Sequence, residues 1–341
     1  MIREFFGFPK RESRSTLIGE PWHWLSELGV RTKTGDAVTA ENALQISSVF
    51  ACVRLLSETI ASLPLYVYSK EKKGKTAAED HNLFYILHDK PNNYQTSFEF
   101  REMMMGHVLL RGNAYAFIEK NQRGQVTQLV PLNPIRMVVK KVDNRLVYEY
   151  SREGAEKETF SQDEILHFKG LSNDGIVGLS PAALAREAFG LTMAAENYGS
   201  RFFANAARPS GVLSHPQTLK PEAQKKLKES WTQAFTGEGT MGIAVLEEGM
   251  SWETISVSND DAQFLELRQF QVAEIARIFR VPPHMIADLS RATFSNIEEQ
   301  SIEFVTFSLR PWLVRLEQSM NTQLFNRLDR GKYFTEHMEL S

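Results

Sequence analysis

The segment whose residue types come closest to a known binding chemistry is the loop of residues 170–180. It contains three glycines, Gly170, Gly175 and Gly178, between an apolar run and the start of a helix. This order is typical of phosphate-binding loops, whose backbone N–H groups hold the phosphate. The loop lacks a Gly-Lys-Ser/Thr ending and dinucleotide glycine spacing, so we favour a turn into a helix capped by Ser180, with Pro181 first. A soluble phosphate- or nucleotide-binding enzyme using this loop stays open as the alternative.

Other reactive side chains occur in patterns that have a structural explanation. Asp260 and Asp261 could form an acid pair, but two carboxylates at the start of a helix also complement its dipole. Cys52 lies in an apolar helical pattern, and we expect it to be buried. The sequence has no His-Glu-x-x-His motif, no paired cysteines, no Gly-x-Ser-x-Gly motif and no Walker A loop. We therefore predict no catalytic residue, no metal site, no cofactor and no enzymatic activity.

The composition argues against several classes of protein. The 341 residues suggest about two domains. With 39 Lys and Arg against 42 Asp and Glu, the net charge of −3 is unlike that of a protein that coats nucleic acid through bulk positive charge. A single cysteine excludes an intramolecular disulfide, and no apolar run approaches the roughly 18 residues of a membrane span. We expect a soluble intracellular protein without membrane contact.

The first half of the chain predicts helices combined with antiparallel strands. Residues 1–40 show no sustained hydrophobic period and predict a flexible arm, in which Trp22, Trp24 and Leu25 could dock locally. Hydrophobic periodicity and turn residues then predict helices over 41–62, 81–88 and 97–111, and strands over 65–68, 114–119, 126–132, 137–142, 146–150 and 165–168. This pattern indicates an α+β domain, with its helices on one side of an antiparallel sheet.

The second half predicts three long apolar helices. The first, Ala-rich helix spans about 181–205, the second 261–281, and the third about 297–326 with Pro311 as a kink in its middle. Residues 211–258 form a small insertion of strands and a helix between the first two. The lysines of that insertion could contact phosphate, but neighbouring glutamates favour a solvated helix face. Long apolar helices need partners that bury their apolar surface.

Several sequence strings, in order, resemble those of the portal proteins of tailed double-stranded DNA bacteriophages. The resemblance covers residues 40–330 and rests on 47–54 (SSVFACVR), 60–64 (IASLP), 110–115 (LRGNAY), 132–134 (LNP), 178–181 (GLSP), 205–211 (NAARPSG) and 279–286 (FRVPPHMI).

The resemblance implies an α+β, portal-like fold with an antiparallel-sheet wing domain, long stem helices, a small α/β clip insertion and a kinked C-terminal helix. The implied divisions are a flexible N-terminal arm (1–40), the wing (41–178), a stem helix (179–209), the clip (210–258), a second stem helix (259–283), a tunnel-loop region (284–296) and a kinked helix returning to the wing (297–341). We expect the C-terminal crown segment found in many portal proteins to be absent.

The implied function is a dodecameric ring at one capsid vertex that serves genome packaging, head–tail joining and DNA ejection. The implied partners are double-stranded DNA in the channel, the terminase large subunit, the major capsid and scaffold proteins, and a head-completion adaptor. The protein would be assembled in the host cytoplasm and reside in the virion. A phage head-assembly adaptor of another kind stays open beside the enzyme alternative.

The resemblance also assigns two groups of site residues. The tunnel loop, which would reach into the DNA channel, comprises Ser290, Arg291, Ala292, Thr293, Phe294, Ser295 and Asn296. The clip residues expected to face the motor or adaptor are Lys220, Lys225, Lys226, Lys228, Trp231, Glu247 and Glu248.

Overall fold

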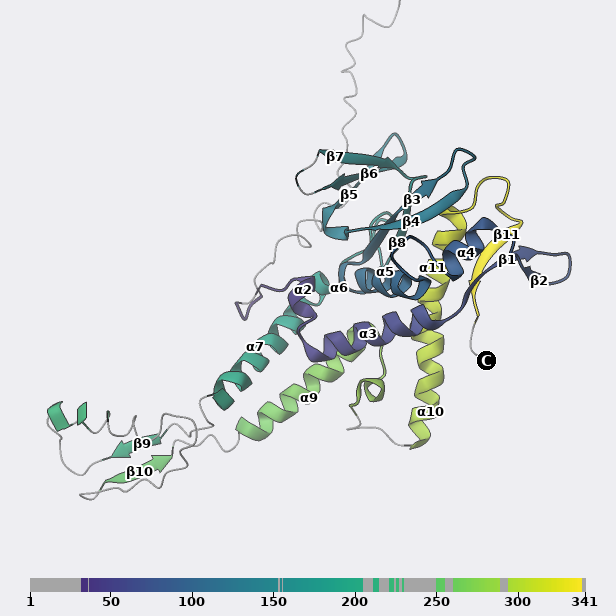
Figure 1. Ribbon diagram of the computed structural model, residues 1–341. Helices are drawn as coiled ribbons and strands as arrows, with labels where there is room; N and C mark the ends of the chain where they lie inside the picture. The colour runs from purple at the N-terminus through teal and green to yellow at the C-terminus, as the bar shows by residue number, and fades with distance from the viewer. Residues whose placement is uncertain are drawn as a thin grey trace, which may run out of the picture. The chain divides into compact units, whose positions relative to one another are not determined.

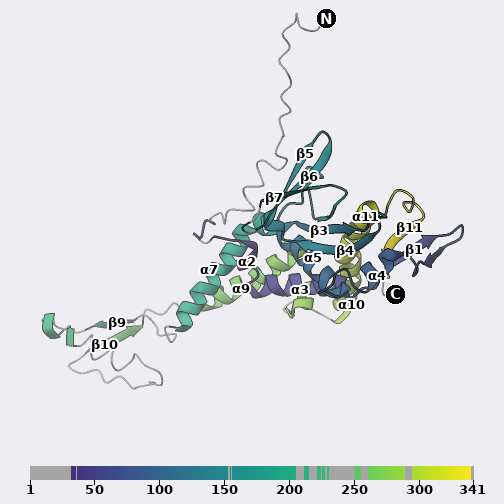
Figure 2. The same cartoon turned by 45° about the horizontal axis from the view of Figure 1, so that its top comes forward.

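The computed structural model describes residues 32–35, 37–152, 154, 156–204, 211–214, 221–223, 225–226, 229, 250–254, 260–288 and 294–338 (Figures 1 and 2). The chain divides into two compact units: unit 1 comprises Met1–Ala194 and Gln269–Ser341, and unit 2 comprises Ala195–Arg268. Helices α7 (Arg186–Ala204) and α9 (Asp260–Phe279) contribute residues to both units. The boundary therefore runs through helices, not through a linker.

A pair of packed helices, α3 (Ser47–Ser62) and α5 (Ser97–Arg111), lies at the centre of unit 1 (Figure 1). The apolar face of α3 is buried along its length by Val49, Cys52, Val53, Leu56 and Ile60. Burial of Cys52 confirms the prediction, and it raises the pKa of the thiol to about 12. This cysteine is therefore a packing residue.

Helix α5 begins and ends at residues whose types dictate the boundary. The Thr96 side chain accepts a hydrogen bond from Glu99 N at 3.3 Å, and the Glu99 carboxylate accepts one from Thr96 N at 2.7 Å. This reciprocal capping box satisfies two N–H groups that a helix start leaves without partners. At the other end Gly112 has a φ of 76°, a left-handed conformation that glycine adopts without strain.

The helix predicted over 41–62 is two helices, and the predicted arm is shorter than residues 1–40. Helix α2 (Ala40–Ala43) has its own capping box between Thr39 and Asn42, and a turn separates it from α3. Thr32, Val38 and Ala40 are buried, so the last part of the expected arm packs on unit 1. Residues 1–31 lie outside the described part of the chain.

Two three-stranded antiparallel sheets replace the single antiparallel sheet that the sequence predicted. One has the order β4–β3–β8, with β3 (Asn113–Lys120), β4 (Val126–Leu132) and β8 (Ile165–Lys169). The other has the order β5–β6–β7, with β5 (Met137–Val142), β6 (Arg145–Ser151) and β7 (Lys157–Ser161), of which β7 was not predicted. Helix α5 packs on strands β3 and β8 of the first sheet (Figure 1).

A third small sheet joins distant parts of the sequence. Strand β1 (Leu65–Lys70) pairs with β2 (Lys75–Ala77) and with β11 (Tyr333–His337), both antiparallel, and helix α4 (Asn82–His88) packs on it. The sequence predicted no strand near residue 335. It gave no local signal because the partner of this five-residue strand lies more than 260 positions away.

The helix predicted over about 297–326 is divided by a π-helical segment just before Pro311. Helix α10 (Phe294–Glu303) continues through a π-helical segment, Phe304–Leu309, into α11 (Arg310–Gln323). Pro311 lies in the first turn of α11, where its missing N–H interrupts the α-helical hydrogen-bond ladder. The helix predicted from Pro181 is likewise divided, into α6 (Pro181–Leu184) and α7, with Ala185 between them in a non-helical conformation. Ser180 caps α6 as predicted.

Unit 2 contains a two-stranded antiparallel sheet and the adjoining ends of α7 and α9. Strands β9 (Gly211–Ser214) and β10 (Ser251–Thr254) pair antiparallel. They lie near the two ends of the insertion, in which the sequence predicted strands. The rings of Tyr198 and Phe264 lie 5.7 Å apart, and a Cβ on Gly199 would lie 3.1 Å from Phe264. Glycine therefore allows the two helices to approach closely.

The close contact at Gly112 yields a test with a matched control. Gly112 and Gly124 have φ values of 76° and 74°, so alanine incurs a similar backbone cost of about 1–2 kcal/mol at both. A Cβ at Gly112 would lie 2.1 Å from the Leu179 carbonyl oxygen, whereas nothing lies within 4 Å at Gly124. We expect Gly112→Ala to lower the melting temperature much further than Gly124→Ala in differential scanning calorimetry. Equal shifts would contradict the close contact.

A second test uses His107, which is half-buried in α5. Burial, with a smaller contribution from the Arg111 charge, lowers the pKa of His107 to about 4, and its Nδ1 has no hydrogen-bond partner among the described residues. Between pH 6.5 and pH 4 the unfolded chain binds a proton that the folded chain does not, so the free energy of unfolding falls as the pH falls.

We expect His107→Leu to reduce this pH dependence by up to about 1.4 kcal/mol per pH unit. The measurement is urea unfolding followed by circular dichroism at pH 7, 6 and 5. Identical slopes for the variant and the unaltered chain would mean that His107 titrates alike in both states.

Candidate interaction surfaces

A buried hydrogen-bond network joins the end of α5 to the loop of residues 170–180. Asn113 Nδ2 donates to the Gly178 carbonyl and Asn113 Oδ1 accepts from Gly178 N, both at 2.7 Å. A Cβ on Gly178 would lie 2.0 Å from the Gly112 carbonyl oxygen, so only glycine allows this approach. The strings LRGNAY and GLSP, which are far apart in the sequence, thus meet here backbone to backbone.

The network continues through a neutral histidine between the two three-stranded sheets. His167 Nε2 lies 3.0 Å from Asn113 Oδ1, which can only accept, so we assign the proton to Nε2. His167 Nδ1 then accepts from the Tyr148 hydroxyl at 3.3 Å. Burial, with a smaller effect of the Lys169 charge, holds the pKa of His167 well below its ordinary value, which is consistent with this neutral tautomer. The histidine thus acts as a structural connector.

The internal hydrogen bonds of residues 170–180 argue against phosphate binding. Ile176 N and Val177 N donate to Asp174 Oδ1 at 2.7 and 3.0 Å, and Gly178 N donates to Asn113. Burial raises the pKa of Asp174, but these hydrogen bonds outweigh it and hold the pKa below its ordinary value. The Asp174 carboxylate already occupies the position that an anion would take, so the geometry does not support the nucleotide-binding alternative.

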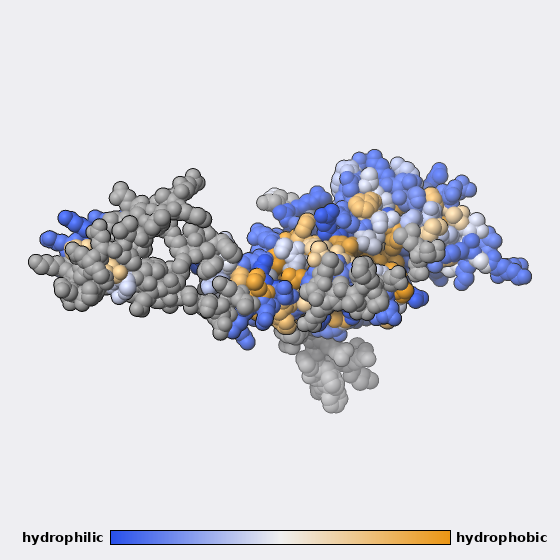
Figure 3. All heavy atoms as spheres, turned by 90° about the horizontal axis from the view of Figure 1, so that it is seen from below, coloured by the Kyte–Doolittle hydropathy of each residue, from blue (hydrophilic) through white to orange (hydrophobic). Residues whose placement is uncertain are grey.

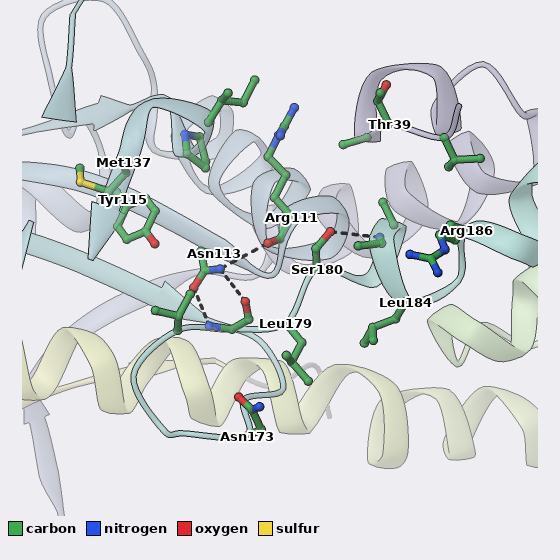
Figure 4. Close-up of a pocket in the computed structure, with 18 of the residues that line it drawn as sticks. Thr39, Arg111, Asn113, Tyr115, Met137, Asn173, Leu179, Ser180, Leu184 and Arg186 are labelled. Atoms are coloured by element: carbon green, nitrogen blue, oxygen red, sulfur yellow. Dashed lines mark hydrogen bonds between the residues drawn. The ribbon is translucent and has the colours of Figure 1, made fainter. Parts of the chain in front are cut away.

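A groove of about 280 Å³ lies beside this network in unit 1 (Figure 4). Tyr115 and Met137 line the end nearest the sheets, whereas Thr39, Leu184 and Arg186 line the end nearest α6. Two arginines contribute to the lining: Arg111 also pairs with Glu41, and Arg186 Nε lies 3.7 Å from a Glu187 carboxylate oxygen. The groove combines apolar walls with two arginines and two carboxylates, those of Asp174 and Glu187.

Sequence reasoning did not predict this groove. Its lining comes from five separate stretches of the chain, between Val38 and Glu187, that become neighbours only on folding. One usable signal was present, because Arg111, Asn113 and Ser180 belong to two of the strings that resemble portal proteins.

Helix α9 exposes large apolar side chains in several directions. Leu265 is 64% exposed and Phe270 55% exposed, and Leu267 is exposed as well. At about 100° per residue these three positions point to different sides of the helix. Figure 3 shows that apolar atoms reach the surface on the face seen from below. A helix that is apolar around its circumference is normally buried against other helices.

The π-helical segment adds a second exposed apolar surface. Ile302, Val305 and Phe307 are all exposed, whereas Phe304 and Leu309 on the same turn are buried in the core of unit 1. π-helical turns occur frequently at functional sites. This surface, like that of α9, is available for contact with another molecule.

Most of the predicted tunnel loop cannot be compared with the structure. Ser290, Arg291, Ala292 and Thr293 lie outside the described residues. The backbone of Phe294, Ser295 and Asn296 forms the first turn of α10, so a loop extending to residue 296 is wrong for these last three positions. A helix start at Phe294 extends the helix predicted from residue 297 by one turn.

The predicted clip residues are also described only in part. Lys225 and Lys226 are helical and exposed, and so are the helical residues Glu222 and Glu229. Lys220, Lys228, Trp231, Glu247 and Glu248 lie outside the described residues. The mixture of exposed charges of both signs agrees with a solvated helix face.

The described residues contain neither a candidate metal site nor a candidate membrane-spanning helix. No group of three or more His, Cys, Asp or Glu residues there could hold a metal ion. In the same part of the chain no helix is both long and apolar enough to cross a membrane.

Comparison with known proteins gives consistent matches across the chain. Residues 47–339 match the family model described as phage portal protein. The portal protein of Enterobacteria phage HK97 is 38% identical over 309 residues, which cover 89% of this chain and 73% of that protein. The probable portal protein of Streptomyces phage phiC31 is 39% identical, with coverages of 87% and 68%.

A solved structure matches the fold as well. It is the neck of a native gene transfer agent (GTA) particle computed with C12 symmetry, and a chain in it superposes with a TM-score of 0.63 at 25% identity. The match covers 88% of this chain and 83% of that one.

Proposed function

Because the chain belongs to the phage portal protein family, we propose that its copies form a ring-shaped channel at one capsid vertex, through which double-stranded DNA is packaged and ejected. The observation that supports the ring most directly is the exposed apolar surface of α9, which a single copy does not bury. The protein is a virion component, like the related neck chain of the gene transfer agent particle. This family assignment removes the support for an enzyme and for another kind of head-assembly adaptor.

A rotationally symmetric ring requires two different faces of each copy to be complementary. In such a heterologous contact one surface of a subunit binds another surface of the next, and the ring closes when the rotation returns to its start. The apolar side chains of α9 and of the π-helical segment, including Phe270 and Phe307, are the surfaces we assign to these contacts. We propose twelve copies, by analogy with the C12 symmetry of the related neck.

We assign the parts of the chain to portal roles as follows. Residues 41–178 form the wing, the helices α7 and α9 form the stem, and residues 210–258 form the clip that contacts the terminase large subunit and later the head-completion adaptor. Residues 284–293, which precede α10, carry the tunnel loop, and the C-terminal helix returns to the wing. The major capsid and scaffold proteins surround the ring in the capsid.

The near-neutral charge of the chain suits a passive channel. Each cationic contact with a DNA phosphate releases counterions and raises affinity, and a moving duplex would have to break that contact at every step. A net charge of −3 limits this braking, and Arg291 is the cation of the proposed tunnel loop. The work of translocation is then done by the separate motor and not by the ring.

The ring is tested by substituting its proposed apolar contact. Leu265→Glu combined with Phe270→Glu should prevent closed rings, because it places charges where a neighbour would bury apolar surface. In native mass spectrometry the unaltered chain should give about 470 kDa, which is twelve copies of 38.9 kDa, and the variant should give small species.

Leu328→Glu is the matched control, because Leu328 is 77% exposed but lies on the turn before β11. It should leave the rings intact. Monomers and dimers of the unaltered chain at every salt concentration would overturn the ring proposal.

The tunnel-loop assignment has a separate test. Deleting residues 290–293 spares α10, which begins at Phe294, and should leave closed rings in electron micrographs while reducing DNA packaging in an in vitro assay. The reason is that the loop contacts DNA but contributes none of the apolar contacts assigned above. If the deletion abolished rings, the loop would be an assembly element instead.

A further inference from the structure

The lining of the groove beside the Asn113 network is suited to binding a ligand. The side chain of Tyr115, a residue 3% exposed, lines the groove and offers it a hydroxyl. A hydroxyl can both donate and accept a hydrogen bond, so a polar atom of a ligand in the groove could pair with it. The opposite end of the groove has Leu184, which is 56% exposed, and the Arg186 guanidinium (Figure 4). The site therefore suits an apolar or aromatic group that also carries a polar atom.

The described chain begins at the edge of this groove. Thr32 packs so closely on α7 that a Cβ on Gly190 would lie 2.6 Å from its methyl carbon. Lys33 N donates to a Glu187 carboxylate oxygen at 3.2 Å, and Glu187 itself lines the groove. The chain then contributes Val38, Thr39 and Ala40 to the lining. Residues preceding Thr32 are thus tethered within about one helical turn of the groove.

The residues just before Thr32 have the side chains that the groove suits. The sequence from 21 to 28 is PWHWLSEL, with two tryptophans, two leucines and one acidic residue, Glu27. We propose that the groove binds this N-terminal segment of the same chain, with Trp22, Trp24 and Leu25 as its apolar anchors. This inference concerns a contact within one subunit and goes beyond ring formation.

Size and reach agree with this occupant. Eight residues separate Thr32 from Trp24, which allows up to about 29 Å of extended chain. The groove volume of about 280 Å³ exceeds the roughly 150 Å³ of a cavity that accommodates benzene, so an indole ring can enter. An indole N–H can donate to the Tyr115 hydroxyl, and an arginine can stack on the ring face.

Cysteine cross-linking tests the contact in the full-length chain. The native Cys52 is buried, and its thiol has a pKa of about 12, so it should not react. Leu25→Cys with Leu184→Cys, treated with a short bis-maleimide, should cross-link within one chain, as shown by the linked peptides in mass spectrometry. Leu25→Cys with Leu328→Cys is the control and should remain unlinked.

Three outcomes of the cross-linking would overturn the inference. These are no cross-link, equal cross-linking of the control pair, or a ladder of covalent oligomers, which would show the segment in a neighbour's groove. Ring formation of the same variants, measured by native mass spectrometry, reports separately on the proposed function.

Tryptophan quenching gives a second measurement on a variant that should fold. Leu184→Glu should release the segment and increase acrylamide quenching of fluorescence, because the anchoring tryptophans become accessible to solvent. Leu171→Glu is the matched control, since Leu171 is 65% exposed but does not line the groove. The increase should be lost when Trp22→Phe and Trp24→Phe are added. An increase that persisted without these tryptophans, or none at all, would contradict the docking.

Discussion

The contact between the backbones of Gly112 and Gly178 is the constraint on which the rest of unit 1 depends. At this point α5 ends, β3 begins, the loop of residues 170–180 closes and the chain turns into α6. A side chain on either glycine would overlap a carbonyl oxygen, so the approach exists only because both residues are glycine. Asn113 then converts the close approach into two hydrogen bonds with Gly178. The direction in which α7 leaves the sheets follows from this junction, because Ser180 and Pro181 come directly after it.

Unit 1 also exposes apolar surfaces on some of its helices. The separation of a buried core from these exposed apolar surfaces explains how one chain can be both a folded subunit and part of an assembly. The last two turns of α9 bury Ile275, Ala276 and Phe279, whereas the turns before them expose Leu265 and Phe270. Burying a side chain of this size contributes about 1.5–3 kcal/mol, so each exposed one retains a driving force for association. The interior of unit 1 is fixed by its own contacts, and the helix surfaces are left for a neighbour.

Local sequence signals predicted most elements and failed where a contact is distant. The capping box of Thr96 and Glu99 and the cap at Ser180 each depend on residues within one or two turns, and both are present. Strand β11 was missed because its partner is β1, and the separation of the β5–β6–β7 sheet was missed because hydrophobic alternation does not specify which strands pair. The ring and its role came from the family resemblance, since neither charge nor periodicity identifies DNA as cargo.

The groove illustrates a further limit of local reasoning. Its walls join the end of a helix, a strand, a loop and the start of α7, and no window of the sequence contains more than a part of them. Trp22, Trp24 and Leu25 form an apolar cluster in the sequence, but such a cluster alone does not identify the surface that it contacts. The structure adds a groove lined by the Tyr115 hydroxyl and a close contact of Thr32 with α7 at Gly190. A tethered segment has a high effective concentration at a nearby site, so even weak individual contacts can hold it there. Docking would then connect the first turns of α7 to the sheets through a second path, in addition to the Gly112–Gly178 junction.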